Sequence, residues 1–198
     1  MAKQVFPGSL SGRTMKALMS FVKKDRGYDL ICTPLLWHGR IWATDQCCIA
    51  AVDWVMAAEE LDNEKVYKIP CEAVEKVLVG NEYYISTASW SPEIVNLKAK
   101  DSACELEDVT DRIGKVMSQM QTLLDASVKP DDMNEPFALA GLAPDYLANV
   151  CALAKAVGSP TIDMNYRAVN ASDAFPIFKV KFLGATEAAD AIIAPKRA

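Results

Sequence analysis

The feature of this sequence that most constrains its fold is a repeated pattern in which one helix is followed by three strands. The first copy begins with a helix at about residues 14–24, which Ser9 or Ser11 caps and Gly27 ends. Its apolar residues recur with the spacing of one helical face, at Met15, Leu18, Met19 and Val22. Three runs rich in strand formers follow, separated by turns at 38–39 and 45–46. These expected strands span residues 28–36, 40–43 and 48–55.

Two further copies follow the same order along the chain. Pro70 opens the second helix at residues 72–79, and Pro144 opens the third, which continues to about residue 157. A short strand is expected before each helix, at 66–69 and 137–142. The strands after them are expected at 83–87, 93–98, 103–106, 161–168, 175–182 and 189–193. The repetition predicts an α+β fold that is built from helix-plus-three-strand units.

A connector separates the second copy from the third. Its first part has apolar residues at helical spacing, from Ile113 through Met117 to Leu124, and its second part, 127–136, is polar and bounded by proline. We therefore expect a first domain at residues 1–108, a connector at 109–136 and a second, truncated domain at 137–198.

Composition and charge limit the classes of protein to which this chain can belong. The 198-residue chain is 51% hydrophobic and carries a net charge of −5, yet its first 40 residues are rich in Lys and Arg. No apolar run approaches the ~18–20 residues of a membrane span, and no targeting segment is visible, so a soluble cytoplasmic protein is expected. Six cysteines without the spacing of a disulfide framework predict reduced thiols: Cys32, Cys47, Cys48, Cys71, Cys104 and Cys151.

The sequence offers no pattern typical of a catalytic or cofactor site. His38, the only histidine, lies in an expected turn, where a Cys/His nucleophile would lack an orienting group. The acidic run at 59–64 lacks the ligand alternation of a calcium loop, and the cysteines lack zinc spacing. Neither a P-loop nor a dinucleotide fingerprint is present. We therefore expect no enzyme activity, no cofactor and no metal, and a protein that works by binding.

Basic residues form the strongest physical signal for a ligand. They recur on one side of the first helix, beside its apolar face, at Arg13, Lys16, Lys23 and Lys24. Such a stripe suits phosphates of duplex DNA, which bind without sequence readout and with strong salt dependence. The alternative interpretation is an ordinary solvated helix face.

Four stretches of the chain resemble the DNA polymerase sliding clamps, especially the bacterial processivity subunit. The first is Arg-Ile-Trp-Ala-Thr-Asp at 40–45 with Ile-Ala-Ala at 49–51, and the second is the strand-to-helix junction at 67–78. The third, Phe-Ala-Leu-Ala-Gly-Leu-Ala-Pro-Asp-Tyr-Leu at 137–147, resembles the last helix entry. The fourth joins 175–179 with the tail Ile-Ile-Ala-Pro-Lys-Arg at 192–197. The chain departs from the family in two ways. A clamp domain contains two such units, whereas this chain has three in total, and Ala194 stands where the family usually has a larger apolar residue.

The resemblance implies a ring whose helices line a central channel and whose strands form the outer wall. It implies a homo-oligomer, with a trimer favoured over a tetramer, that encircles duplex DNA and holds a polymerase or another replication protein through a short peptide. The implied peptide pocket lies between the 44–49 corner and the C-terminal tail, at Thr44, Cys47, Ile49, Ile192, Ala194 and Pro195. The alternative function is a binding or scaffold module that keeps the fold without forming a ring.

Overall fold

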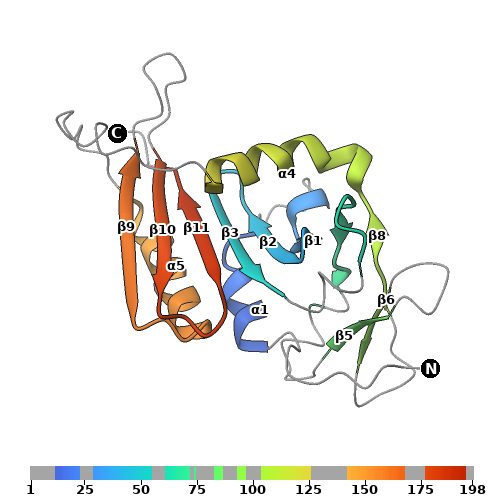
Figure 1. Ribbon diagram of the computed structural model, residues 1–198, viewed down its shortest axis with the longest axis horizontal. Coiled ribbons are helices and arrows are strands. Elements are labelled where there is room, and N and C mark those ends of the chain that lie inside the picture. The colour runs from blue at the N-terminus through green and yellow to red at the C-terminus, as the bar shows by residue number, and fades with distance from the viewer. Residues whose placement is uncertain are drawn as a thin grey trace.

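The computed structural model has an α+β architecture (Figure 1). It describes residues 12–22, 29–54, 61–71, 74, 83–86, 93–96, 104–125, 142–167 and 177–194. Its helical elements are α1 (Gly12–Leu18), the 3-10 helix η1 (Asp29–Ile31), α4 (Thr110–Asp125) and α5 (Pro144–Ala156). The expected helix at 72–79 and the expected strand at 137–142 lie almost entirely outside the described residues.

One antiparallel sheet of eight strands forms the centre of the molecule, in the order β8-β4-β1-β2-β3-β11-β10-β9. Its strands are β1 (Leu35–Trp37), β2 (Arg40–Thr44), β3 (Cys48–Asp53), β4 (Tyr67–Lys68), β8 (Glu107–Asp108), β9 (Thr161–Arg167), β10 (Ile177–Leu183) and β11 (Ala189–Ile193). A separate sheet holds β5 (Tyr83–Ser86), β6 (Glu93–Asn96) and β7 (Cys104–Glu105). The large sheet therefore takes strands from both sides of the 109–136 connector.

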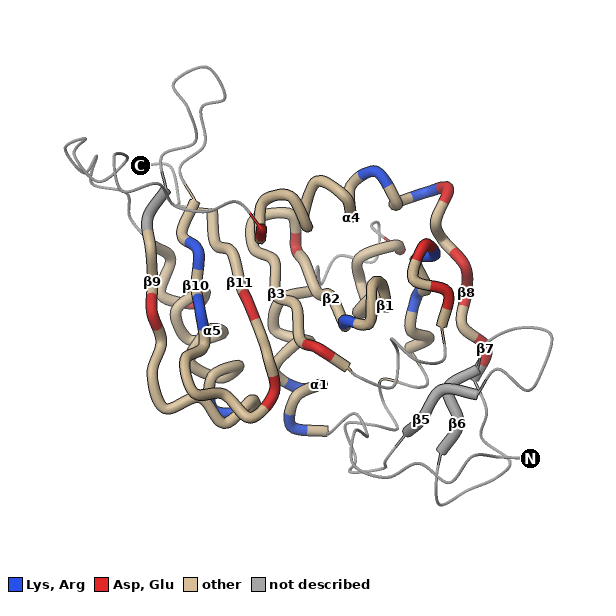
Figure 2. Tube along the Cα trace, viewed as in Figure 1, with Lys and Arg blue, Asp and Glu red and all other residues tan. Residues whose placement is uncertain are grey.

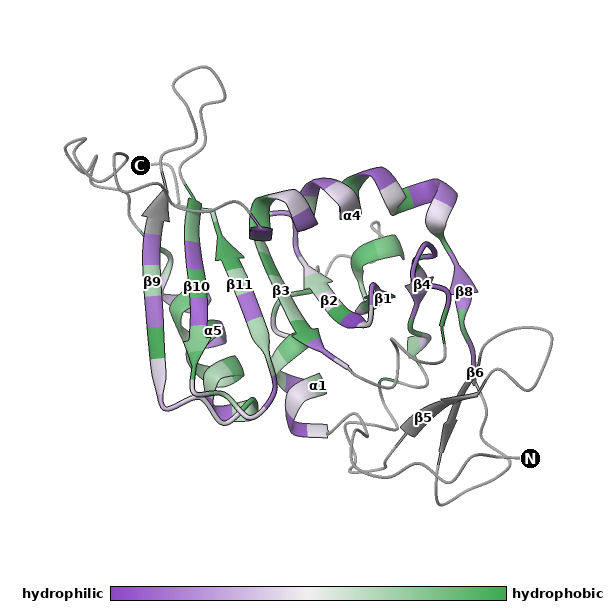
Figure 3. Cartoon of the chain, viewed as in Figure 1, coloured by the Kyte–Doolittle hydropathy of each residue, from purple (hydrophilic) through white to green (hydrophobic). Residues whose placement is uncertain are grey.

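Helices cover both faces of the large sheet. Alternate side chains of a strand point to opposite faces, and in β3 Ala50 and Val52 lie in the core beneath α1 and α5, whereas Ile49 and Ala51 lie beneath α4. Both α1 and α5 lie behind the sheet in the view of Figure 1, while α4 crosses the upper ends of its strands. Figure 3 shows green, apolar residues along most of β3 and much of β11, which lie between these layers.

The tight turn expected between the first two strands is confirmed. His38 and Gly39 both have positive φ, 50° and 68°, which is the geometry of the two-residue turn that matches strand twist in a hairpin. The β1–β2 register follows from it, with Trp37 opposite Arg40. The expected helix at 113–124 and the proline-started helix at 144–157 are confirmed as α4 and α5.

Two elements near the N-terminus differ from expectation. The first helix ends at Leu18 rather than near residue 24, because the Ser20 hydroxyl donates to the Ala17 carbonyl and the chain turns there. Residues 29–31 form a 3-10 helix where a strand was expected, and the Asp29 carboxylate in it pairs with Lys68 of β4 at 2.7 Å. A contact with a distant strand has thus overridden the local strand propensity.

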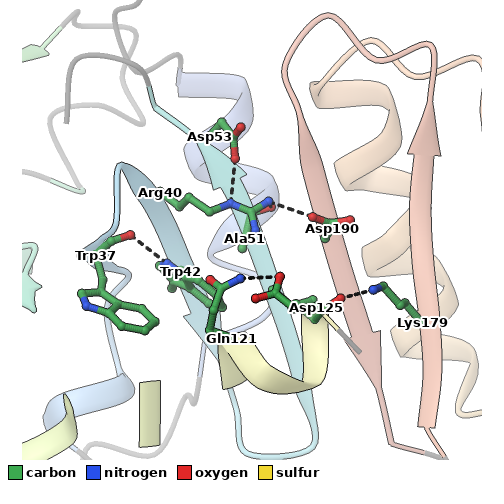
Figure 4. A network of polar contacts seen from close by, with 10 residues as sticks. Trp37, Arg40, Trp42, Ala51, Asp53, Gln121, Asp125, Lys179 and Asp190 are labelled. Atoms are coloured by element: carbon green, nitrogen blue, oxygen red, sulfur yellow. Dashed lines mark hydrogen bonds and ion pairs between the residues drawn. The ribbon is translucent and has the colours of Figure 1, made fainter. Parts of the chain in front are cut away.

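The β3–β11 pairing joins the two halves of the chain, and Arg40 bridges this seam (Figure 4). From β2, its guanidinium lies 2.7 Å from Asp53 of β3 and 2.9 Å from Asp190 of β11. The guanidinium also lies 5.6 Å from the centre of the Trp42 ring. The Arg40 side chain is only 14% exposed, so solvent screens these pairs less than ordinary surface pairs.

Replacing Arg40 should therefore weaken the seam. Arg40→Met keeps the length of the side chain but leaves Asp53 and Asp190 without their shared cation, so we expect a loss of about 1–2 kcal/mol in the free energy of unfolding. Urea denaturation measures this loss. Lys115→Met is the matched control, because Lys115 is an exposed cation on α4, away from the seam, and it should change stability by no more than about 0.5 kcal/mol. Equal effects of the two changes would contradict the bridging role.

Candidate functional site

The predicted basic stripe is only partly within the described residues. Arg13 and Lys16 of α1 are both exposed, while Thr14, Met15, Ala17 and Leu18 of the same helix are buried. Lys23 and Lys24 lie outside the described residues. Two cations therefore project from the outer side of α1, and Figure 2 shows the blue positions on this short helix.

The α1 helix packs beside α5 to form one helical layer. The Asn149 side chain of α5 donates to the Ser20 carbonyl at 2.8 Å, just after α1 ends. The described charged residues of α5 are Asp145 and Lys155, and both are exposed. The layer thus has a modest excess of positive charge on its outer side among the described residues.

The β2–β3 corner is held by its own side chains. The Thr44 hydroxyl donates to the Cys48 carbonyl at 2.7 Å and accepts the Gln46 N–H at 3.1 Å. The Asp45 carboxylate accepts the backbone N–H groups of Cys47 and Cys48, both at 2.8 Å. Side-chain oxygens that accept backbone N–H groups in this way fix the path of a tight turn.

Asp45 also links this corner to α5. Its carboxylate accepts the Tyr146 hydroxyl at 3.2 Å and the Cys48 thiol at 3.1 Å. Burial, followed by the nearby Asp45 carboxylate, raises the pKa of both Cys48 and Tyr146 well above their ordinary values. Both groups therefore remain neutral donors at physiological pH, and the corner is bound to the helical layer.

Asp45 and Tyr146 were not among the predicted site residues. Both belong to stretches that carry the clamp resemblance, at 40–45 and 137–147, which was the available signal. Spacing could not pair them, because they lie 101 residues apart in the chain.

The structure brings together five of the six predicted pocket residues. Strand register places Thr44 opposite Ile49 and Ile49 opposite Ile192, and the Ala194 N–H donates to the Cys47 carbonyl at 2.8 Å. Pro195 lies outside the described residues. The five residues are therefore neighbours at the ends of three paired strands.

This cluster is not open to a peptide at its apolar centre. Ile49 is 8% exposed and Ile192 is 3% exposed, because they share a core with Met117, Met120 and Leu124 of α4. Uncovering such a side chain costs about 1.5–3 kcal/mol. Lifting α4 off the sheet would consume most of the roughly 8 kcal/mol that a micromolar ligand provides. A ligand must therefore approach beside α4 rather than beneath it.

An open apolar groove of about 380 Å³ does lie beside α4, and Thr44 is part of its lining. Along α4 it follows Ile113, Val116 and Met120, and Val116 is 43% exposed. The facing wall is η1, and the remaining lining residues are Asp29, Leu30, Ile31, Gln46 and Arg112. The sequence predicted α4 as a helix, but nothing in its spacing identified it as one wall of a groove.

Charged residues surround one end of this groove. Arg112 donates to Glu107 at 3.1 Å, and Asp29 pairs with Lys68 at 2.7 Å. Hydrogen bonding to the Lys68 ammonium, together with its positive charge, holds the pKa of Asp29 below its ordinary value. The groove therefore combines an apolar wall with a charged rim, which is the usual composition of a small peptide or ligand site.

Among the residues that the structure describes, no group of three or more His, Cys, Asp or Glu side chains could hold a metal ion. His38 is exposed on the β1–β2 turn, with its ring 4.1 Å from that of Trp37. Among the described helices, none has the length and apolar character needed to cross a membrane.

Comparisons with known protein families, with curated proteins and with solved structures found no match to this chain.

Proposed function

We propose that this chain is a sliding-clamp-like processivity factor, which encircles duplex DNA without reading its sequence and tethers a polymerase or another replication protein. The observation that carries the proposal is the relation between the two ends of the chain. Each of α1 and α5 precedes a set of three antiparallel strands, and the last strands of the two sets, β3 and β11, pair with each other. Both helices lie on the same face of the resulting sheet.

This arrangement supports the proposal, because a clamp-like ring would need helices on one side of a sheet to line a channel and strands on the other side to form the outer wall. Arg13 and Lys16 project from that helical layer, where they would meet phosphates if the layer faced DNA. Tyr146 and Asp45 bind the two units together across this face.

The groove beside α4 is the partner site that we assign within this proposal. It includes Thr44 from the predicted pocket and is open where Ile49 and Ile192 are closed. Apolar side chains dominate its walls, so a short peptide with two or three apolar anchors fits its chemistry. In a ring this groove would lie on the outer side, away from the DNA.

A non-ring scaffold module with the same fold is the second candidate. Two observations favour it: α5 presents Asp145 as well as Lys155, and the whole chain carries a net charge of −5. A layer with little positive charge would hold DNA weakly. The two candidates differ in assembly, since only a ring requires head-to-tail interfaces that close.

Assembly is therefore the first test. Two domains per chain and six per ring predict a trimer, and a tetramer is the alternative if each chain contributes three units. Light scattering should give a particle of three, or else four, times the 21.6 kDa chain mass. A monomer at micromolar concentration would rule out a stable ring and leave the scaffold module.

DNA binding is the second test, and it can be assigned to one face. Changing Arg13 and Lys16 together to Ala should weaken binding to unrelated duplexes alike and flatten the salt dependence of log K by about 1.8 per chain, the value for two lost phosphate contacts. Titrations at several salt concentrations measure this slope. The matched control is the Lys115→Ala, Lys181→Ala double variant, which removes two exposed cations from α4 and β10. An equal effect of the control would show that the helical layer is not the DNA-facing surface.

The third test concerns the groove. Val116→Glu places a charge among the apolar groove residues, so the affinity for a fluorescein-labelled hexapeptide with Leu and Phe anchors should fall at least about tenfold from a micromolar Kd. Fluorescence anisotropy measures this affinity. Leu183→Glu is the control, because Leu183 is an equally exposed apolar residue on β10, outside the groove. Unchanged peptide binding by the Val116 variant would place the partner site elsewhere.

A further inference from the structure

Two cysteines, Cys32 before β1 and Cys71 after β4, lie at the same end of the β1–β4 pairing, next to η1. Strands β1 and β4 are antiparallel, with Leu35 opposite Lys68, and the Ile69 N–H donates to the Pro34 carbonyl at 3.1 Å in the same register. Cys32 lies two residues before Pro34 and Cys71 two residues after Ile69, so both cysteines are close to this last hydrogen-bonded pair. A disulfide requires Cα atoms about 4.4–6.8 Å apart, and two segments that are only two residues beyond a hydrogen-bonded pair are within reach of that separation.

A second contact holds the same two segments together. Lys68, three residues before Cys71, pairs with Asp29, three residues before Cys32, at 2.7 Å. The ion pair brings η1 against β4, so the two cysteine-bearing segments are held close before any covalent bond forms. This reduces the chain reorganisation that closing a disulfide would require.

The two thiols differ in access. Cys71 is exposed, whereas Cys32 is half-buried and its thiol donates to the Asp29 carbonyl at 3.1 Å. Burial raises the pKa of Cys32, the Lys68 ammonium opposes this effect, and the nearby Cys71 thiol adds to it. A small oxidant in solution therefore reaches Cys71 first, with Cys32 in position to act second.

We propose that Cys32 and Cys71 are a redox modification site, which takes low-molecular-weight disulfides such as glutathione disulfide and closes to an intramolecular disulfide. In the first exchange the Cys71 thiolate attacks the small disulfide, which forms a mixed disulfide and releases one small thiolate. In the second exchange the Cys32 thiolate attacks the Cys71 sulfur of the mixed disulfide and releases the remaining small thiolate. Two protein thiols are oxidised, one small disulfide is reduced to two thiols, and the protons lost by the cysteines pass to those thiolates.

The disulfide would fix one wall of the groove. Leu30 and Ile31 of η1 line that wall, and Cys32 follows them directly. A bond from Cys32 to the segment after β4 would restrain η1 and make the groove's shape depend on the thiol redox state. This consequence for partner binding rests on the proposed function, whereas the disulfide itself does not.

The test uses the full chain, incubated with glutathione disulfide and then digested and mapped by mass spectrometry without reduction. We expect a peptide crosslinked through Cys32 and Cys71 that disappears on adding dithiothreitol. In Cys32→Ser the second exchange is blocked, so Cys71 should instead retain one glutathionyl group. Cys151→Ser is the control, because Cys151 is exposed on α5 and its loss should leave the crosslink unchanged.

Two results would overturn the proposal. The first is a stable mixed disulfide on Cys71 in the unaltered chain with no crosslink, and the second is a crosslink that joins a different pair of cysteines. Circular dichroism of each serine variant establishes that it is folded before mapping. The hexapeptide titration of the reduced protein tests the groove separately, so failure of peptide binding and failure of the disulfide are distinguishable.

Discussion

The antiparallel pairing of β3 with β11 is the interaction on which the rest of this structure depends. It connects strands that are more than 130 residues apart, and by doing so it turns two short sets of strands into one sheet with two faces. Long-range pairing of this kind closes a large loop at an entropic cost that only extensive burial can offset. The apolar burial that offsets this entropic cost includes Ala50, Ala191 and Ile193, which are fully buried along the seam beneath α1 and α5.

The two faces of the sheet have different coverings, and this difference determines which surfaces are free for partners. On one face α1 and α5 pack together and leave Arg13 and Lys16 outside. On the other, α4 is secured at both ends: the Thr110 hydroxyl at its start accepts the Val66 N–H, and Lys179 of β10 donates to the Leu124 carbonyl near its end (Figure 4). A cation at a helix C-terminus is favourable both as a donor and against the helix dipole. This anchoring keeps α4 on the sheet, so the accessible apolar surface is the groove along its side.

The proposed functions use these two surfaces separately. A DNA-facing helical layer needs only a field that attracts phosphates, because contacts of that kind position a protein without specifying sequence. A peptide groove needs a fixed shape, which the bonded 44–48 corner, α4 and η1 supply from three parts of the chain. The proposed disulfide between Cys32 and Cys71 would add a chemical means of changing one of these walls.

The sequence by itself determined most of the local elements of this protein. Hydrophobic periodicity, together with turn residues and prolines at the ends of elements, placed seven elements close to their observed positions: β2, β3, α4, α5, β9, β10 and β11. The same signals placed the turn at His38 and Gly39, where both residues have positive φ. These features follow from side-chain spacing and from local backbone preferences, which are present in any short stretch of the chain.

Tertiary structure alone decided what those elements form together. Residues 29–31 became η1 rather than strand because Asp29 meets Lys68 of a later strand, and the helical spacing of α4 did not reveal that it would cover Ile49 and Ile192. For the same reason the sequence could not show that Ile49 and Ile192 would be buried under α4, or that an open groove would form beside them. The physical cause is that burial and pairing depend on which distant surfaces meet, and one chain's local pattern does not encode that choice.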